Sequence, residues 1–270
     1  GVSSRSIEYA YNDFCISQVA KILDNPKAHE QYLDRSKKIF NIFYKEKGFF
    51  WGKDKQGKWL QDFTPLPTRW DTWNDPLFYE GGSMTYSNYV PHAMDQLIEL
   101  HGGPEAYEKH LDSVFNSGFK LGNEPLFLVP YLYNYICKPS KSAQKIRELL
   151  DNQFKTGTKG LPGQDDSGAI SSWYVWSSIG IFPVAGQPVY LIGSPVFSEI
   201  KIDLENNKSL KIKKANSNPE NIYVRSVSIN GKKLNRAWIS HNEIINGAEI
   251  IFTMSKEPED DWCQKAPPSY

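Results

Sequence analysis

The chain has 270 residues, which is enough to bury a sizeable core in one large domain or in two modest ones. Lysine and arginine together number 31, as do aspartate and glutamate, so the formal net charge of +0 excludes a whole-chain attraction to nucleic acid or to an anionic membrane. Aromatic residues make up 14% of the chain, with 8 Trp and 15 Tyr, a surplus that favours sites in which rings stack on a ligand. No stretch approaches the roughly 20 apolar residues that a membrane-spanning helix needs.

The cysteines Cys15, Cys137 and Cys263 are odd in number and far apart, and none has a C-x-x-C spacing. The sequence therefore predicts neither a zinc site nor a disulfide framework. Cys15 and Cys137 lie in apolar, helix-like segments and are interpreted as buried small hydrophobic residues. The first residues, GVSSRSIEYAYNDF, lack the basic, apolar and small-residue regions of a signal peptide, as expected of a mature or truncated product.

Apolar side chains three and four residues apart predict a helix over residues 5–24, which Asn25 and Pro26 end. A second helix is expected over residues 29–45. Residues 49–76 are rich in Gly, Pro, Trp and Asp and are predicted to form a long irregular loop of the kind that carries function. Further helices are predicted over residues 87–100, 104–115, 125–136, 140–154 and 168–179.

After Pro183 the pattern changes to short β-branched or aromatic segments separated by Gly, Asn and Pro turns. Strands are predicted over residues 189–192, 197–204, 210–214, 222–229, 238–240 and 249–254, with a hairpin signal at Asn230-Gly231. We therefore predict an α+β protein with a helical domain over residues 1–187 and antiparallel β-sandwich strands over residues 188–270. Because the predicted helices are too few to close a ring of paired helices, a preceding N-terminal region is expected.

Three glycine-containing turns between predicted helices carry carboxylates: Glu80 before Gly81, Glu124 beside Asn123, and Asp165-Asp166. Glycosidic bond cleavage needs one protonated carboxyl group and one ionised carboxylate, and Glu80 and Asp166 could form that pair. Asn123 and Glu124 offer the hard oxygen ligands that Ca²⁺ prefers. Taken singly, each of these residues is more typical of a helix cap or of an acid in a first helical turn; three such turns on one helical scaffold favour the functional interpretation.

Several aromatic and histidine residues also have two readings. His92, beside Pro91 in an apolar segment, is more typical of a structural histidine than of a general base. Trp173 follows the Asp165-Asp166 turn in a helix-like aromatic run, and tryptophan rings are common platforms for sugars. Trp59, Trp70 and Trp73 in the long loop fit sugar platforms or loop packing equally well.

The motifs resemble glycoside hydrolase family 92, the calcium-dependent exo-acting α-mannosidases. They are Ile7-Glu8-Tyr9-Ala10-Tyr11, Tyr79-Glu80-Gly81 with Tyr86 and Val90-Pro91-His92, Gly122-Asn123-Glu124-Pro125, Pro130-Tyr131-Leu132-Tyr133-Asn134-Tyr135, Gly160-Leu161-Pro162-Gly163 with Asp165-Asp166 and Trp173-Tyr174, and Ile192-Gly193-Ser194-Pro195. The resemblance extends from near residue 6 to about Trp262 in the family's order.

The resemblance implies the later part of an (α/α)6 helical toroid, the catalytic domain, followed by strands that return to an N-terminal β-sandwich, which would precede this chain. It also implies inverting hydrolysis of terminal α-mannosides from N-glycans or mannan, with Ca²⁺ bound to O2 and O3 of the sugar and helping to distort its ring. Secretion or export to the periplasm is an expectation from the family alone.

Residue by residue, the resemblance implies that Glu80 is the general acid and Asp166 the general base, with Asp165 beside it. Asn123 and Glu124 would lie at the Ca²⁺ ion. His92, Trp173 and Gln164 would contact the substrate. For inversion, the two catalytic carboxyl groups should stand roughly 6.5–9.5 Å apart.

The sequence departs from the family pattern at Gly82 and Met84, where Asn and Trp are usual, and at Gln164, where some members have Asp. Leu126-Phe127-Leu128 replaces a polar, His-containing segment. These positions keep open a second hypothesis, a catalytically impaired homologue or fragment that binds carbohydrate without turnover. A third, a toroidal glycosidase acting on glucosides, is disfavoured because it has no obvious use for calcium-type ligands.

Overall fold

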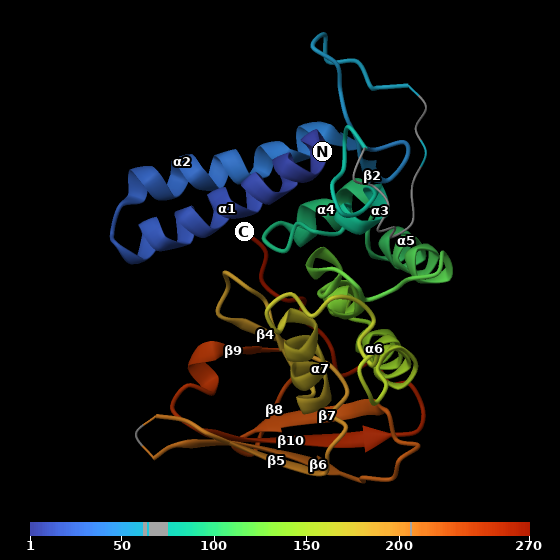
Figure 1. Ribbon diagram of the computed structural model, residues 1–270. Helices are drawn as coiled ribbons and strands as arrows, with labels where there is room; N and C mark the ends of the chain where they lie inside the picture. Colours follow the sequence, from blue (N-terminus) through green and yellow to red (C-terminus); the bar gives the residue numbers. More distant parts are fainter. Residues whose placement is uncertain (62–63, 65–74, 206) are drawn as a thin grey trace. The chain divides into compact units, whose positions relative to one another are not determined.

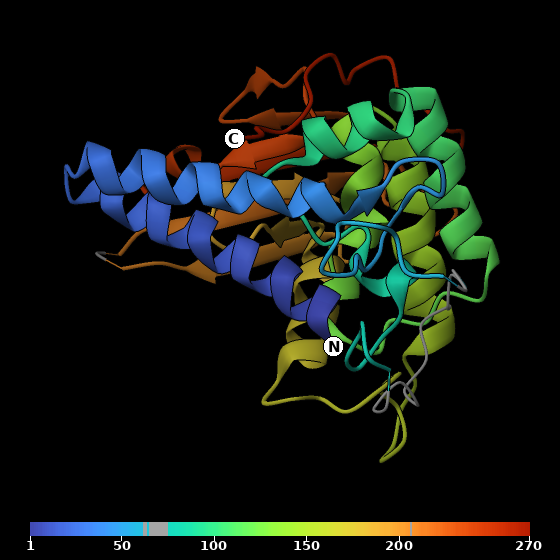
Figure 2. The ribbon, with the colours of Figure 1, turned by 90° about the horizontal axis from the view of Figure 1, so that it is seen from above.

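The computed structural model describes residues 1–61, 64, 75–205 and 207–270. The chain forms two compact units: unit 1 is Gly1–Leu126 with Ser269–Tyr270, and unit 2 is Phe127–Pro268. Figures 1 and 2 show the helices and strands within each unit from two directions. In the described residues, no helix has both the length and the apolar character needed to cross a membrane.

Unit 1 is mainly helical. Its elements are α1 (Val2–Ile22), α2 (Pro26–Lys37), η1 (Lys38–Ile42), the hairpin strands β1 (Phe43–Tyr44) and β2 (Phe49–Phe50), α3 (Ser83–Tyr86), α4 (Met94–His101), α5 (Pro104–Asn116) and η2 (Glu124–Leu126). Helices α1 and α2 lie side by side in both views (Figures 1 and 2). The predicted break at Asn25-Pro26 is confirmed, because the Asn25 side chain caps α2 by accepting a hydrogen bond from the Ala28 N–H at 3.1 Å.

Helix α1 buries one face and exposes apolar side chains on another. Ile7, Ala10 and Phe14 have the predicted helical spacing and are buried. Large apolar residues at the surface of α1 and its C-cap are Tyr9, Ile16, Val19, Ile22 and Leu23, of which Ile22 is 83% exposed. An exposed apolar helix face of this kind is typical of a surface against which another part of a longer protein packs.

The helix predicted over residues 87–100 is interrupted: α3 ends at Tyr86 and α4 starts only at Met94. Pro91 explains the interruption, because the residue before a proline is pushed away from helical geometry. Helix α4 ends at Gly102 and α5 begins after Gly103, and both glycines have φ near +100°.

Unit 2 combines helices and strands. Its elements are η3 (Val129–Ile136), α6 (Pro139–Gln153), α7 (Ala169–Ile179), β3 (Ile181–Pro183), β4 (Val189–Ile192), β5 (Glu199–Asp203), β6 (Ser209–Ala215), β7 (Tyr223–Ile229), β8 (Lys232–Lys233), β9 (Trp238–Ser240), η4 (His241–Glu243) and β10 (Ala248–Ser255). The segment predicted as an α-helix over residues 125–136 is instead two 3-10 helices, η2 and η3. Within η3, Pro130 has no N–H to give to an α-helical ladder.

The strands form two sheets, one with the order β5-β6-β10-β7-β8 and one with the order β3-β4-β9. The prediction of wholly antiparallel strands is wrong at one place, because β10 pairs with β6 in parallel. Strand β7 lies on the other side of β10, so the chain crosses over before β10 inserts between β6 and β7. The hairpin predicted at Asn230-Gly231 joins β7 to β8, and both turn residues have positive φ.

Both sheets contribute to one hydrophobic core. Ile181 and Ile239 come from the smaller sheet, and Ile250 and Phe252 from the larger one. The buried Asn134 side chain ties η3 to this part by donating to the carbonyl groups of Ile192 and Ala237. Helices η3, α6 and α7 therefore belong with the strands to one compact unit, which begins at Phe127.

Candidate active site

Glu80 stands in a tightly held turn before α3, within unit 1. Its φ of 55° lies in the left-handed region, which a glutamate rarely adopts. The turn is held on its N-terminal side by the Tyr86 hydroxyl, which donates to the Tyr79 carbonyl at 3.0 Å. On its C-terminal side the Gly82 N–H donates to the Thr85 hydroxyl at 3.2 Å. A Cβ atom at Gly81 would come within 2.9 Å of the Thr85 side chain, so glycine suits this position.

Asn123 connects the Glu80 turn to η2. Its side-chain amide donates to the Glu80 carbonyl oxygen at 2.6 Å, and its Oδ1 accepts a hydrogen bond from the Glu124 N–H at 2.9 Å. The sequence grouped Asn123 with Glu124 as metal ligands, and the contact to Glu80, 43 residues away, was not foreseen. Asn123 therefore orients two of the predicted site residues at once.

The charges of three carboxylates act on the buried phenol of Tyr86. Burial raises the pKa of Tyr86, and the charges of Glu8, Glu80 and Glu124 raise it further. Burial also raises the pKa of Glu8, and the Glu124 carboxylate adds to that rise. Glu8 belongs to α1 and was given no role from the sequence, although it lies within one of the family motifs. These contacts place Glu80, Glu124 and Glu8 in one acidic region of unit 1.

The acidic region offers carboxylate and amide oxygens, which are the ligands that calcium prefers. The negative charge of the Glu124 carboxylate adds to the rise in the pKa of Glu8, and a divalent cation between two such carboxylates would relieve this repulsion. Calcium takes roughly six to eight oxygen ligands. Across the residues that the structure describes, no group of three or more His, Cys, Asp and Glu side chains is arranged to hold a metal ion. These residues would therefore supply part of a ligand set, not all of it.

Asp165 and Asp166 lie in the turn that leads into α7, within unit 2. Both carboxylate oxygens of Asp165 are engaged, accepting from the Ser171 N–H and the Ser171 hydroxyl at 2.8 Å each. Asp166 has a left-handed φ of 43° and an exposed side chain. Asp165 thus anchors the turn to the first turn of α7, and Asp166 presents its carboxylate to solvent.

A pocket of about 410 Å³ opens beside this turn. Its lining includes Ser171, which holds Asp165, and the rings of Phe154 and Tyr174. The Tyr174 side chain is 41% exposed, and its ring centroid lies 5.0 Å from that of Phe154. Gln164 is exposed on the same turn. The pocket is therefore connected to the Asp165 turn through Ser171, and its lining combines aromatic rings with a hydroxyl group.

Two residues predicted to contact substrate are buried instead. The Trp173 ring is 1% exposed, stacks on Phe154 and donates its Nε1–H to the Phe127 carbonyl at 2.9 Å. His92 is 0% exposed and stacks on Phe14, with ring centroids 5.1 Å apart. These packing contacts leave neither ring the open face that a sugar platform needs. The structural reading of His92 is the one that its packing supports.

Trp59 in the long loop also packs locally. Its ring is parallel to that of Tyr44 with centroids 4.4 Å apart, and the Lys53 ammonium group lies 4.2 Å from its centroid. Of the two readings of this residue, loop packing is the one observed. Trp70 and Trp73 lie outside the described residues.

Comparisons with known proteins identify the class of protein. The profile of the glycosyl hydrolase family 92 catalytic domain matches residues 2–256. A secreted glycosidase from Arthroderma benhamiae, itself named as uncharacterised, is 35% identical over 96% of this chain and 36% of its own length. The chain thus matches the catalytic domain of a glycosyl hydrolase family over almost its whole length.

Solved structures agree with this class. A family GH92 α-mannosidase from Bacteroides thetaiotaomicron, in complex with mannoimidazole, superposes with a TM-score of 0.91 at 31% identity, covering 99% of this chain and 38% of that one. An inverting GH92 mannosidase from the same organism gives a TM-score of 0.89 at 31% identity, covering 99% of this chain and 39% of its own. The chain belongs to glycosyl hydrolase family 92, and it spans well under half the length of these relatives.

Proposed function

We propose that the protein containing this chain is a calcium-dependent, inverting exo-α-mannosidase that removes terminal α-mannose from N-glycans or mannan. The observation that supports this most directly is the Glu80 turn. A glutamate with left-handed φ is held there by the Asn123 amide, within an acidic region that includes Glu124 and Glu8. Such strained, over-determined backbone is typical of functional sites.

Glu80 would act as the general acid and donate a proton to the leaving glycosidic oxygen. Asp166 would act as the general base and take a proton from the attacking water, with its turn held by Asp165. For an inverting reaction the two carboxyl groups should stand roughly 6.5–9.5 Å apart in the complete protein, which leaves room for that water. Exposed Gln164 would contact the sugar from the Asp166 turn.

Asn123 and Glu124 would hold the calcium ion. The Glu8 carboxylate, which interacts electrostatically with Glu124, would add negative charge beside the ion. When bound, calcium would polarise sugar hydroxyl groups and favour a distorted ring. The remaining ligands would come from outside these residues. The relatives are more than twice as long as this chain, so the region that precedes it is expected to complete both the fold and the site. We expect the whole protein to be exported.

The test is mannose release from a panel of α-linked mannosides by the full-length protein, with calcium and after chelation. Glu80→Gln and Asp166→Asn should each abolish release, because each removes one proton-transfer group. Glu30→Gln and Asp151→Asn, at exposed acids in the same two units, should leave release unchanged. Proton NMR of the first product should show β-mannose. If α-mannose is the first product released, the inverting mechanism is refuted. If full activity remains after chelation, calcium dependence is refuted.

A carbohydrate-binding homologue without turnover is the alternative that this experiment separates. The departures at Gly82, Met84 and Gln164 leave it open. It predicts saturable binding of mannosides by the wild type with no release at any calcium concentration. Glu80→Gln would then leave the binding unchanged.

A further inference from the structure

Two cysteines that are far apart in the sequence meet in unit 2. The sulfur atoms of Cys137 and Cys263 lie 2.8 Å apart, although 126 positions separate the residues. Cys263 is 7% exposed, and Cys137 is half-buried. The spacing of the cysteines predicted no disulfide framework, and the three cysteines are free in the structure, but the fold brings two of them into contact.

Cys137 is held in place by its own backbone. It ends η3 with φ 52° and ψ 43°, a left-handed conformation that turns the chain into α6. Its N–H donates to the Asn134 carbonyl at 3.2 Å, and the next residue, Lys138, donates to the Tyr133 carbonyl at 2.9 Å. The buried Asn134 side chain anchors the same turn to Ile192. The Cys137 sulfur is thus positioned by a fixed turn.

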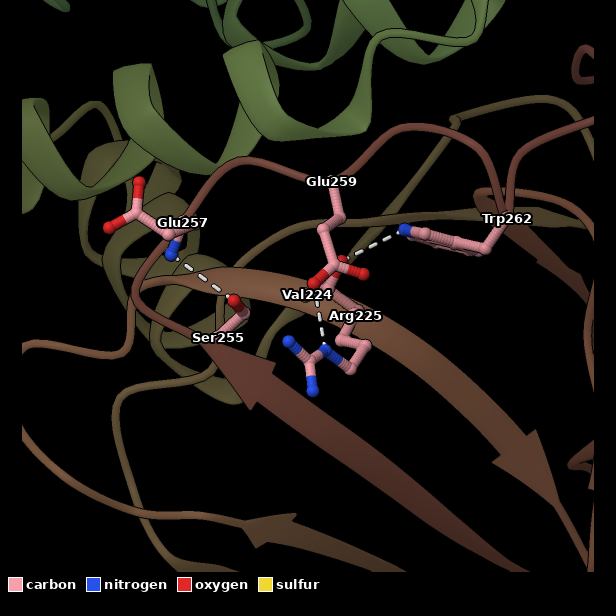
Figure 3. Close-up of polar contacts among 6 residues, drawn as sticks. All are labelled: Val224, Arg225, Ser255, Glu257, Glu259 and Trp262. Atoms are coloured by element: carbon pink, nitrogen blue, oxygen red, sulfur yellow. Dashed lines mark hydrogen bonds and ion pairs between the residues drawn. The ribbon is translucent and has the colours of Figure 1, made fainter.

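The segment that leads from the end of β10 at Ser255 to Trp262, the residue before Cys263, is fixed to β7 at Val224 and Arg225 (Figure 3). The Trp262 indole donates to the Val224 carbonyl at 2.8 Å, and Arg225 pairs with Glu259 at 2.7 Å. The Cys263 N–H donates to the Asp260 carbonyl at 2.9 Å, which closes a turn around the cysteine. Trp262, immediately before Cys263, is therefore buried and fixes this part of the chain to β7.

Asp260 joins the two cysteine segments. Its carboxylate accepts a hydrogen bond from the Ser140 N–H at 2.9 Å and lies 3.9 Å from the Lys138 ammonium group. Both partners follow Cys137 closely in the chain. The segments are thus held together by contacts other than the sulfur atoms, and joining the sulfurs needs only a small shift to the S–S length of about 2.0 Å.

We propose that Cys137 and Cys263 are a site of disulfide formation, with a disulfide of low molecular weight, such as glutathione disulfide, as the oxidant. The Cys137 thiolate attacks one sulfur of the oxidant and releases one thiol. The Cys263 sulfur then attacks Cys137 and releases the second thiol. Two cysteine thiols are oxidised by two electrons in total, and one oxidant disulfide is reduced to two thiols.

The order of the steps follows from burial. Cys137 is the more exposed sulfur, so it meets the oxidant first. Burial raises the pKa of the Cys263 thiol, and its hydrogen bond to Cys137 raises it further, which disfavours Cys263 as the first thiol to attack the oxidant. Its sulfur lies 2.8 Å from that of Cys137, so the second attack is intramolecular and needs no further encounter. The bond would link the start of α6 to the C-terminal segment and close a loop of 126 positions. It is independent of the proposed hydrolytic function.

The experiment uses the full-length protein, incubated folded with glutathione disulfide, then denatured, alkylated and digested with trypsin. Mass spectrometry of the wild type should find the peptides holding Cys137 and Cys263 joined, lighter than their sum by two hydrogen atoms, and separated by dithiothreitol. Cys15→Ser, at the third cysteine, is the matched control and should give the same joined peptide. In Cys137→Ser, Cys263 should be recovered alkylated.

A stability readout accompanies the mapping. Reduction should lower the melting temperature of the transition of unit 2 by roughly 5–15 °C in the wild type and in Cys15→Ser. It should leave the melting temperature of Cys263→Ser unchanged. Recovery of both cysteines separately alkylated from the oxidised wild type would overturn the proposal. Joining of either cysteine to Cys15, or only glutathione adducts on both, would overturn it as well.

Discussion

His92 should make unit 1 sensitive to mild acid. The ring is fully buried against Phe14, and burial lowers its pKa from the ordinary 6.5 to about 4, with the Ser36 backbone opposing the fall and the charge of Lys37 adding to it. A histidine whose pKa is lowered by folding binds its proton more readily when unfolded. Its contribution to stability is therefore fully present above about pH 6.5 and is lost as the pH falls from 6.5 towards 4.

The magnitude follows from the size of this shift. One pKa unit corresponds to about 1.4 kcal/mol, so the fall from 6.5 to about 4 is worth roughly 3 kcal/mol in full, and roughly 2–3 kcal/mol by pH 4.5. His92→Phe keeps an aromatic ring against Phe14 but cannot take a proton. The variant should lose roughly 2–3 kcal/mol less than the wild type between pH 7 and pH 4.5.

The assay is urea unfolding of both proteins, followed by tryptophan fluorescence at several pH values. Phe14→Leu is the matched control, since it disturbs the same packing and retains the imidazole. It should lower the free energy of unfolding at every pH and keep the wild-type slope. Some slope should also persist in His92→Phe, because burial lowers the pKa values of His101 and His110 to about 4 and about 3. An unchanged slope in His92→Phe would refute the reasoning.

Two further predictions concern backbone geometry. Asn123→Ala removes the amide that holds the Glu80 carbonyl. We therefore expect kcat for mannoside hydrolysis by the full-length protein to fall roughly 100-fold with little change in KM. An effect on KM alone would argue against a positioning role of Asn123. Gly180→Ala should destabilise unit 2 by roughly 1–3 kcal/mol more than the matched control Gly157→Ala. Both glycines have φ near +95°, but only a Cβ atom at Gly180 would meet Pro195, at 2.8 Å. Equal losses of melting temperature in both variants would contradict the steric argument.

Local signals in the sequence predicted the elements that depend on local physics. Strand β4 (Val189–Ile192), strand β9 (Trp238–Ser240) and the Asn230-Gly231 hairpin appear as predicted, because alternation and turn chemistry act over a few residues. The parallel pairing of β10 with β6 was missed. It depends on where the chain returns after a crossover, which no short pattern encodes.

The candidate site shows the same limit. Its residue types were visible, since carboxylates in glycine turns suggest chemistry wherever they occur. The long-range contacts were not, because Asn123 meets Glu80 across 43 positions and Cys137 meets Cys263 across 126. The sequence also did not show which of these side chains are buried. Trp173 and His92 have the residue types of a sugar site, but only the packing around them shows that their rings face the core.

Backbone conformation sets Glu80 apart from the other carboxylates of the chain. Among the described non-glycine residues with positive φ, most are Asn or Asp, whose short polar side chains tolerate the left-handed region, and Glu80 is the one glutamate. A glutamate has no local hydrogen bond that compensates this conformation, so the compensation must come from elsewhere. It comes from Asn123, whose amide holds the Glu80 carbonyl, and from Tyr86, which holds the preceding one. Because this turn costs energy and is held by two side chains from other positions, it supports the proposal that the turn orients the Glu80 carboxyl group for proton transfer.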